Sequence, residues 1–553
     1  MKILVLSLLR LGDAVLATPA IHGLKKRYPN AELHLALNKQ FQGLAPLLPY
    51  VDRFHFFDRN KIQESLALAD RPLFESYDRL SDFLLPLQAE NFDLVVNLTQ
   101  NKLSGWLTSM ISSKDKMGLH FRQDGVAQFG SPWFRHLNQW GLEITGPQFH
   151  FADIFYNGAV GPQENYQFEV SETTKGQDEA KALCTSKKYI TVQLLTNDKK
   201  KNWHVDRFHQ AIETFRKMNL DFEVLVLCSP AERKDVQLFV ERFQDKMVRT
   251  AECSLEGLFS LLKRSSLLLT GDTATKHLAC AALTPIVELS IGSSHYFQTG
   301  SYLNDSLIIQ STEPCAPCHH SKDCPQKSHL CSERVPGDLV GLLCSKLLVK
   351  DWSGIKVISD EFTGYADVLR VAKVSSGHWT AVPLAASPSA EYVDKIFDQM
   401  SWMLLLNNEH NKSLTQIGSL GRRLGEFFER YFSSYDKDDI ALRLFEFENN
   451  LESLEAKIDI FLIDFQEVLK SYSQGYALEN FCQSLNDYSF TLSQKVFLNT
   501  YSNALAYAQK SIQKDDAFVL LRRIRESLFD VKHRCQLETK LVRSVKKYME
   551  NHL

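Results

Sequence analysis

The sequence predicts two α/β domains in series, followed by a short β-rich segment and an all-α region. Residues 1–160 alternate strand-like and helical patterns, and the alternation restarts at residue 174. Strands rich in Val, Ile and Leu that alternate with helices are typical of parallel sheets covered on both faces. Beyond residue 387 the apolar spacing is helical. We therefore divide the chain into 1–165, 166–350, 351–386 and 387–553.

The bulk composition indicates a soluble globular protein. Hydrophobic residues make up 44% of the 553 residues and charged residues 23%, which are ordinary values. The formal net charge of -3 gives no reason to expect a nucleic-acid partner. No apolar run reaches the roughly 18 residues that a membrane span requires.

The first 29 residues allow two interpretations. The apolar run Ile3–Leu9 and the small residues up to Ala20 resemble a secretory signal. However, Arg10 and Asp13 fall where the apolar core of such a signal stays uncharged for roughly 7–15 residues. We therefore expect a buried strand, a Gly-containing loop and a helix with Asp13 at its start.

The remaining elements follow from apolar spacing. In the first domain the strand-like runs are KILVLS, AELHLAL, RFHFFD and FDLVVNLT, and TPAIHGLKKRYP is a helix. In the second domain they are YITVQLLT, FEVLVLC, SLLLTG and PIVELSIG, with helices at 204–218, 255–265, from Thr273 and at 336–349. In the connector, IKVISDEF, VLRVAKV and WTAVPL are expected as strands.

One stretch of the last region has apolar residues spaced alternately by four and three, an a/d seam of about four heptads. Its members are Ile440, Leu444, Phe447, Leu451, Leu454, Ile458, Phe461, Phe465, Val468 and Tyr472. An intrachain bundle and an intermolecular coiled coil both fit this seam. We favour the bundle because amphipathic patterns flank the seam on both sides.

Asp13 is the first candidate for chemistry. It follows the first strand, and ligands of open α/β sheets bind at the carboxyl ends of strands. The alternative is a helix N-cap, in which the carboxylate accepts backbone N–H bonds. The loop RLGD lacks the G-x-G-x-x-G pattern, so a dinucleotide-dependent oxidoreductase is not expected.

Two strand ends of the second domain carry further polar residues. Lys201 follows YITVQLL, where its ammonium could reach a phosphate, and Trp203 could anchor its loop. A solvated lysine loop is the alternative. Glu232 begins the helix after FEVLVL, where it either favours the helix dipole or binds sugar hydroxyls.

The segment LLLTGDTATKHLACAAL is the most informative one. A strand ends there in Thr-Gly-Asp and a helix begins near Thr273, so that free N–H groups form an anion site. Asp272 and Thr273 could cap this helix, and His277 lies one turn along on the same side.

Three segments resemble glycosyltransferase family 9, the heptosyltransferases, in order over residues 1–345. They are MKILVLSLLRLGDAVLATPAIHGLKKRYPNAELHLAL, KNW and GDTATKHLACAALTPIVEL. The last two look like the Lys-x-Trp and Asp-Thr-Gly-x-x-His motifs of that family. The resemblance implies a GT-B fold, in which two Rossmann-like domains face a cleft. It also implies inverting transfer of heptose, or a related sugar, from ADP-heptose to a hydroxyl of a bacterial surface glycan or protein.

The matching motifs place the catalytic base at Asp13. They place donor contacts at Thr196, Lys201, Glu232, Asp272, Thr273 and His277. A carboxylate can take the proton of the acceptor hydroxyl, and a helix N-terminus with Lys201 can stabilise the leaving diphosphate. No catalytic metal is therefore expected. Ala274 stands where the family has Gly, so a methyl group lies near the expected diphosphate.

Four of the 11 cysteines cluster in a C-x2-C-x5-C-x6-C pattern. They are Cys315, Cys318, Cys324 and Cys331. Four sulfurs in 17 residues indicate one structural tetrahedral site for Zn or Fe. The cluster resembles the four-Cys iron site of autotransporter heptosyltransferases. A metal site with otherwise scattered cysteines fits a reducing compartment, so we expect a cytoplasmic protein.

The sequence leaves the acceptor and some partners open. An ADP-sugar donor and a glycan or protein acceptor are expected, and nucleic acid is not. A peripheral contact with the inner face of the cytoplasmic membrane and a homo-oligomer formed through the C-terminal helices remain open. Residues 387–553 are expected to serve assembly or acceptor recognition. Two rival functions are a GT-B scaffold that acts through its helical domain and a GT-B sugar-nucleotide epimerase.

Overall fold

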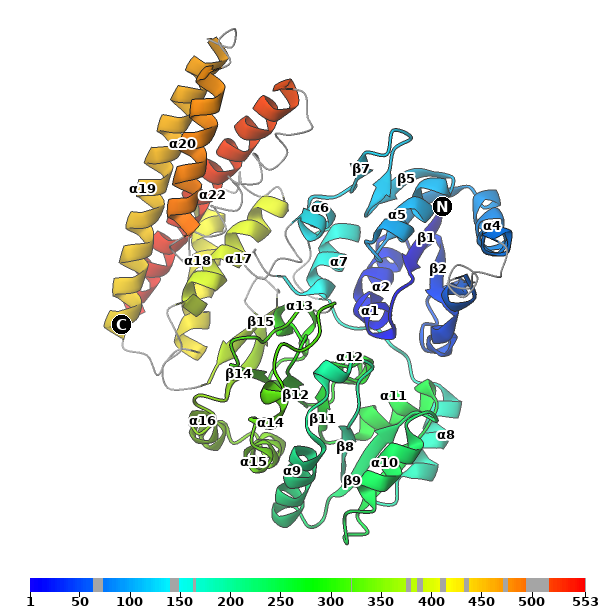
Figure 1. Cartoon of the computed structure of the whole chain (residues 1–553). Helices are drawn as coiled ribbons and strands as arrows, with labels where there is room; N and C mark the ends of the chain where they lie inside the picture. Colours follow the sequence, from blue (N-terminus) through cyan, green and yellow to red (C-terminus); the bar gives the residue numbers. More distant parts are fainter. Residues whose placement is uncertain are drawn as a thin grey trace. The chain divides into compact units, whose positions relative to one another are not determined.

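The computed structural model describes residues 1–62, 73–139, 149–162, 166–319, 321–373, 379–384, 391–407, 414–431, 437–470, 476–493 and 517–552. These residues fall into two compact units, one with the β-sheets and one with the C-terminal helices (Figure 1). No helix within these ranges is long and apolar enough to cross a membrane.

The first sheet is parallel and has the strand order β3-β2-β1-β4-β5. Its strands are β1 (Lys2–Ser7), β2 (Glu32–Asn38), β3 (Arg53–Phe57), β4 (Phe92–Asn97) and β5 (Ser113–Met117). The expected four strands are confirmed. The fifth, β5, was not expected because SKDKM is polar. It lies at the edge of the sheet, where most of its side chains keep contact with solvent.

The opening segment forms a strand followed by helices, as expected. Ile3 to Leu6 are fully buried in β1, and α1 (Leu11–Leu16) and α2 (Thr18–Arg27) follow. Pro19 lies in the first turn of α2, where its missing N–H is tolerated. The other helices of this domain are α4 (Leu73–Ala89), α5 (Lys102–Met110), α6 (Pro132–Gln139) and α7 (Phe151–Ala159).

The second sheet has the order β10-β9-β8-β11-β12-β13-β14-β15, with the first six strands parallel and the last two antiparallel. Its parallel strands are β8 (Tyr189–Gln193), β9 (Glu223–Cys228), β10 (Val248–Glu252), β11 (Leu268–Gly271), β12 (Ile286–Ser290) and β13 (Leu307–Ser311). The helices around it include α8 (Thr174–Leu183), α9 (Val205–Met218), α10 (Arg233–Val240), α11 (Leu255–Arg264), α12 (Ala274–Ala282) and α15 (Gly337–Leu348). Two Rossmann-like domains in series are thus confirmed.

The connector contains two of its three expected strands. β14 (Ala366–Lys373) and β15 (Trp379–Pro383) extend the second sheet beyond β13. The prediction of a strand for IKVISDEF is wrong, because these residues lie in and just after α16 (Trp352–Asp360). Asp351 caps this helix by accepting a 2.9 Å hydrogen bond from the Gly354 N–H. Ile355 and Ile358 are buried three residues apart, which is helical spacing.

The strand order of each sheet fixes where a ligand can bind. β1 lies between β2 and β4, and β8 lies between β9 and β11, so each sheet reverses its order beside its first strand. Ligands of such sheets bind at the carboxyl ends of the strands beside that reversal. Asp13 lies in the first turn of the helix that follows β1, and the segments after β8 and β11 carry Lys201 and Asp272.

The described residues from Glu391 onward form a set of helices. It contains α17 (Glu391–Leu406), α18 (Leu414–Tyr431), α19 (Lys437–Lys470), α20 (Tyr476–Ser493) and α22 (Ala517–His552). Helix α19 packs along α22 and α20. Its seam residues from Leu444 to Val468 are at most 8% exposed, so the expected intrachain bundle is confirmed. The side chain of Ile440 and residue Tyr472 lie outside the description.

Candidate active site

The N-terminus of α12 has no side-chain cap. Thr273 is its N-cap residue, but its side chain makes no capping bond, and its hydroxyl lies 3.1 Å from that of Thr270. The predicted cap is therefore wrong, because Thr273 does not cap and the Asp272 carboxylate binds lysines instead. The first N–H groups of the helix remain available, as in anion-binding helix termini.

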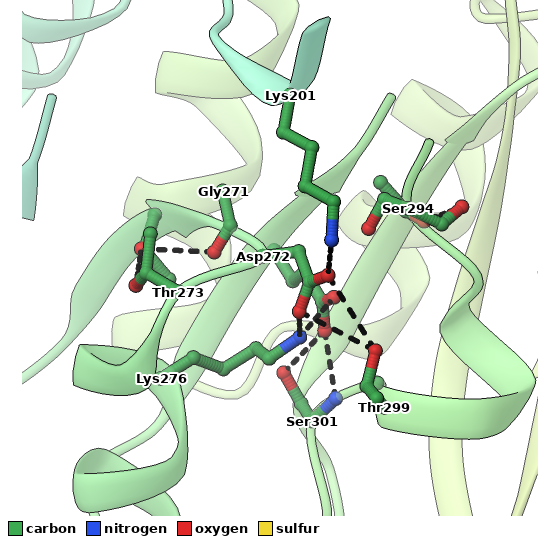
Figure 2. A network of polar contacts seen from close by, with 12 residues as sticks. Lys201, Gly271, Asp272, Thr273, Lys276, Ser294, Thr299 and Ser301 are labelled. Atoms are coloured by element: carbon green, nitrogen blue, oxygen red, sulfur yellow. Dashed lines mark hydrogen bonds and ion pairs between the residues drawn. The ribbon is translucent and has the colours of Figure 1, made fainter. Parts of the chain in front are cut away.

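Asp272 lies at the centre of a buried ion-pair network (Figure 2). Its Oδ2 is 2.6 Å from Lys201 Nζ, and its Oδ1 is 2.7 Å from Lys276 Nζ. Lys276 Nζ also lies 2.6 Å from Glu288 Oε1. Glu288 Oε2 accepts hydrogen bonds from the N–H and the hydroxyl of Ser301 at 2.7 and 2.8 Å.

The network fixes the ionisation of its members. Burial alone would raise the pKa of Asp272, but the charges of Lys276 and Lys201 hold it well below its ordinary value. Burial likewise opposes the charge of Lys276, yet Asp272 and Glu288 raise the pKa of its ammonium. Burial raises the pKa of the Glu288 carboxyl group. Its two oxygens nevertheless accept hydrogen bonds from the Lys276 ammonium group and the Ser301 N–H, which can act only as donors. Lys201 and Lys276 therefore face two acids in a compact cluster.

His277 is a neutral imidazole beside this network. It is 3% exposed, and burial, with the nearby charge of Lys276, holds its pKa well below the ordinary value. Its Nδ1 is buried without a hydrogen-bond partner. Unpaired buried polar atoms are uncommon in proteins and call for an explanation, and a bound ligand would supply one.

Asp13 belongs to α1 of the first domain, and this helix lies against α12. Helix α1 contacts α12, and a side chain at Gly12 would place its Cβ only 3.2 Å from His277 Cδ2. Asp13 is not an N-cap, since it lies in the first turn of α1 after the N-cap Arg10. Burial, helped by the charge of Asp272, raises its pKa to about 6 against the opposing charges of Arg10 and Lys201.

The loop that carries Lys201 is well ordered by its own contacts. The Thr196 N–H donates to Asn202 Oδ1 at 2.8 Å, and the Thr196 hydroxyl donates to the Asp198 carbonyl at 2.7 Å. Trp203 is 2% exposed and its ring packs edge-on against Phe208, as an anchor would. The alternative of a solvated lysine loop does not hold for Lys201, which is 14% exposed.

Glu232 lies at the same edge of the sheet but outside the network. It occupies the N-cap position of α10, and its Oε2 accepts hydrogen bonds from the Ser229 N–H and hydroxyl at 2.9 and 2.7 Å. Because β9 runs parallel to β8 beside it, Glu232 and the Lys201 loop follow neighbouring strand ends. The dipole and the sugar-binding interpretations both remain compatible with this position.

The cysteine loop lies against the Lys201 loop. The Cys318 N–H donates to the Gly292 carbonyl at 2.9 Å, and Lys200 Nζ donates to the Lys322 carbonyl at 2.8 Å. The four thiols are free, and burial with the other three thiols raises the pKa of Cys331 to about 11. Four sulfurs suit a tetrahedral metal. As they lie, however, no three His, Cys, Asp or Glu side chains in the described ranges are placed to hold one.

Sequence reasoning missed Lys276 and Glu288. Each left a local signal. Lys276 follows Asp272 by four residues, the spacing of a helical ion pair. Glu288 is a charged residue in the otherwise apolar strand run PIVELS, where it needs a partner if it is buried.

Comparison with known proteins identifies a family for part of the chain. Residues 83–329 match the family described as "Glycosyltransferase family 9 (heptosyltransferase)". The chain contains a glycosyltransferase family 9 domain. Over 299 residues, it is 22% identical to lipopolysaccharide heptosyltransferase 3 of Escherichia coli K12, a match that covers 52% of the chain and 81% of that relative.

Solved structures are similar at lower identity. Heptosyltransferase II of E. coli is 14% identical, with 64% of this chain and 99% of that one covered and a TM-score of 0.46. The iron-containing dodecameric glycosyltransferase TibC of enterotoxigenic E. coli is 13% identical, with 63% and 76% covered and a TM-score of 0.37.

The matched range sets which site residues belong to the family 9 domain. It includes Lys201, Asp272 and His277, but it begins after Asp13 and ends before Cys331. The domain is a glycosyltransferase domain.

Proposed function

We propose that the protein is an inverting glycosyltransferase that moves heptose, or a related sugar, from an ADP-sugar to an acceptor hydroxyl. The observation that carries this proposal is the meeting of Asp13 with the uncapped start of α12, beside Lys201 and the unpaired Nδ1 of His277. A base and an anion site side by side are what a direct displacement at an anomeric carbon requires.

Each group has a distinct role in the proposed reaction. The Asp13 carboxylate takes the proton of the acceptor hydroxyl as that oxygen attacks the anomeric carbon. A carboxylate with a pKa of about 6 is ionised at neutral pH and is a stronger base than an ordinary aspartate. The α12 N–H groups, Lys201 and His277 bind the departing diphosphate, while Thr196, Glu232, Asp272 and Thr273 shape the donor site.

The acceptor is proposed to be a bacterial surface glycan or protein, modified on the cytoplasmic side of the membrane. Similarity to a lipopolysaccharide heptosyltransferase favours a glycan of the lipopolysaccharide core. The dodecameric TibC offers a precedent for an oligomer, and the C-terminal helices are our candidate for such contacts.

We also propose one structural Zn or Fe ion at the cysteine loop. Cys315, Cys318, Cys324 and Cys331 would hold it, and its part would be to stabilise the loop beside Lys200 rather than to enter the reaction. The four-sulfur donor set and the naming of TibC as iron-containing support the proposal.

The test is a donor and product analysis on the purified protein. ADP-, GDP- and UDP-sugars are compared for binding by calorimetry, and the product of ADP-heptose with a truncated lipopolysaccharide acceptor is analysed by NMR. We expect ADP-sugar preference and a product of inverted anomeric configuration. A retained configuration would contradict the displacement mechanism. Epimerised sugar nucleotide without acceptor would indicate the epimerase, and donor binding without turnover on any acceptor would indicate the scaffold.

A further inference from the structure

Two lysines bind Asp272, and they differ in burial. Lys276 is 0% exposed, whereas Lys201 is 14% exposed. Figure 2 shows them approaching the carboxylate from opposite sides. Lys201 comes from the loop after β8, while Lys276 belongs to the helix that Asp272 precedes. The contact of Asp272 with Lys201 can therefore break more readily than its contact with Lys276.

Lys276 is held in place by a second acid that is itself fixed. Glu288, also 0% exposed, binds Lys276 Nζ at 2.6 Å. Its other oxygen accepts two hydrogen bonds from Ser301. The Ser301 carbonyl in turn accepts a 2.6 Å hydrogen bond from the Trp379 indole N–H, which comes from β15.

The charges of the network limit what Lys201 can do alone. Two ammonium groups and two carboxylates neutralise one another, so an arriving diphosphate finds no surplus positive charge on these four side chains. Lys201 can bind a phosphate only by giving up part of its contact with Asp272. Without another cation, that step would leave a carboxylate that is 7% exposed uncompensated, which is strongly unfavourable.

We propose that Lys276 is a positioning residue that keeps Asp272 neutralised while Lys201 moves to the diphosphate. Lys276 touches no substrate in this scheme and acts through Asp272 and Lys201. The inference rests on the proposed function, because it assumes that a nucleotide diphosphate binds at α12. It explains why a lysine and a glutamate lie fully buried behind the donor site.

The test compares ADP binding by calorimetry in three variants. Glu288→Gln is the reference variant: Lys276 still neutralises Asp272, and because one negative charge is removed from the network, ADP affinity should not fall below that of the unaltered protein. Lys276→Met with Glu288→Gln removes a matched charge pair and leaves Lys201 as the cationic partner of Asp272, beside the Thr299 hydroxyl, which lies 3.4 Å from Asp272 Oδ1. ADP binding should weaken by about 10- to 100-fold, the usual range of coupling between two sites. Adding Asp272→Asn releases Lys201, so ADP should bind more tightly than it does to the double variant.

The outcomes are distinguishable. If the unaltered protein does not bind ADP, the proposed function fails. If it binds ADP and the double variant binds as tightly as Glu288→Gln, this inference is overturned. It is also overturned if Asp272→Asn restores nothing. Should the double variant not fold, Lys201→Met decides the question. With Lys276 in place its melting temperature should stay within about 2 °C of the unaltered protein, and a fall of more than about 5 °C would refute the inference.

Discussion

Replacing Asp13 by Asn should raise stability and abolish transfer. Burial raises the pKa of Asp13 from 3.8 to about 6, so the folded protein holds this proton more tightly than the unfolded chain does. Stability is then lost as the pH rises from about 4 to 6 and stays lower above that. Each pH unit corresponds to about 1.4 kcal/mol, so ionised Asp13 costs the fold at most about 3 kcal/mol. Because the residue keeps some exposure, we expect about 1–3 kcal/mol after solvent screening.

Asn is the informative substitution because it keeps an acceptor for the Arg10 backbone N–H, which bonds to the Asp13 carboxylate, but cannot ionise. Thermal unfolding at pH 7.5 should show a melting temperature at least about 2 °C higher for Asp13→Asn, and the difference should shrink toward pH 4. ADP affinity should be retained while turnover is lost. In the unaltered protein, kcat/KM should rise with pH through an apparent pKa near 6.

Asp338→Asn is the matched control. Asp338 also lies in the first turn of a helix, α15, but it is exposed. Its substitution should change stability by only about 0.3–1 kcal/mol, through the helix dipole, and should lower it. Asp13→Asn that turns over normally would refute the assignment of Asp13 as the base. Asp13→Asn that melts lower than the unaltered protein at pH 7.5 would refute the pKa argument.

Three further predictions concern other parts of the chain. Lys201→Ala and His277→Ala should each weaken ADP binding in calorimetry, since Lys201 supplies a cation and His277 an unpaired buried Nδ1; unchanged affinity in both would move the donor site elsewhere. Elemental analysis should find one Zn or Fe per chain. Cys318→Ser should lose the metal ion and lower the melting temperature of the second domain. Full metal occupancy in that variant would count against the four-Cys site. A chain that ends at Ala386 should bind ADP as the full chain does, because β15 and every donor residue precede that point. Either its oligomeric mass in light scattering or its activity on a full-size acceptor should fall. A truncated chain that equals the full chain in both measurements would contradict the role proposed for the helical region.

Local pattern was sufficient where an element is decided by its own residues. Apolar runs of Val, Ile and Leu predicted β1, β8 and β11, because a strand buried on both faces consists mainly of apolar side chains. The same reasoning failed at residues 355–362. IKVISDEF has strand-like composition, but the Asp351 cap and the packing of Ile355 against the second domain select a helix.

By itself, the sequence determined which polar residues stand at strand ends, and hence that Asp13, Lys201, Asp272 and His277 are candidates for chemistry. Only the tertiary structure decided that α1 of one domain meets α12 of the other and that Lys276 and Glu288 are fully buried partners. The reason is physical. The ionisation of a side chain depends on the charges and the burial that distant segments supply, and those are set by how the sheets and helices pack, not by spacing along the chain.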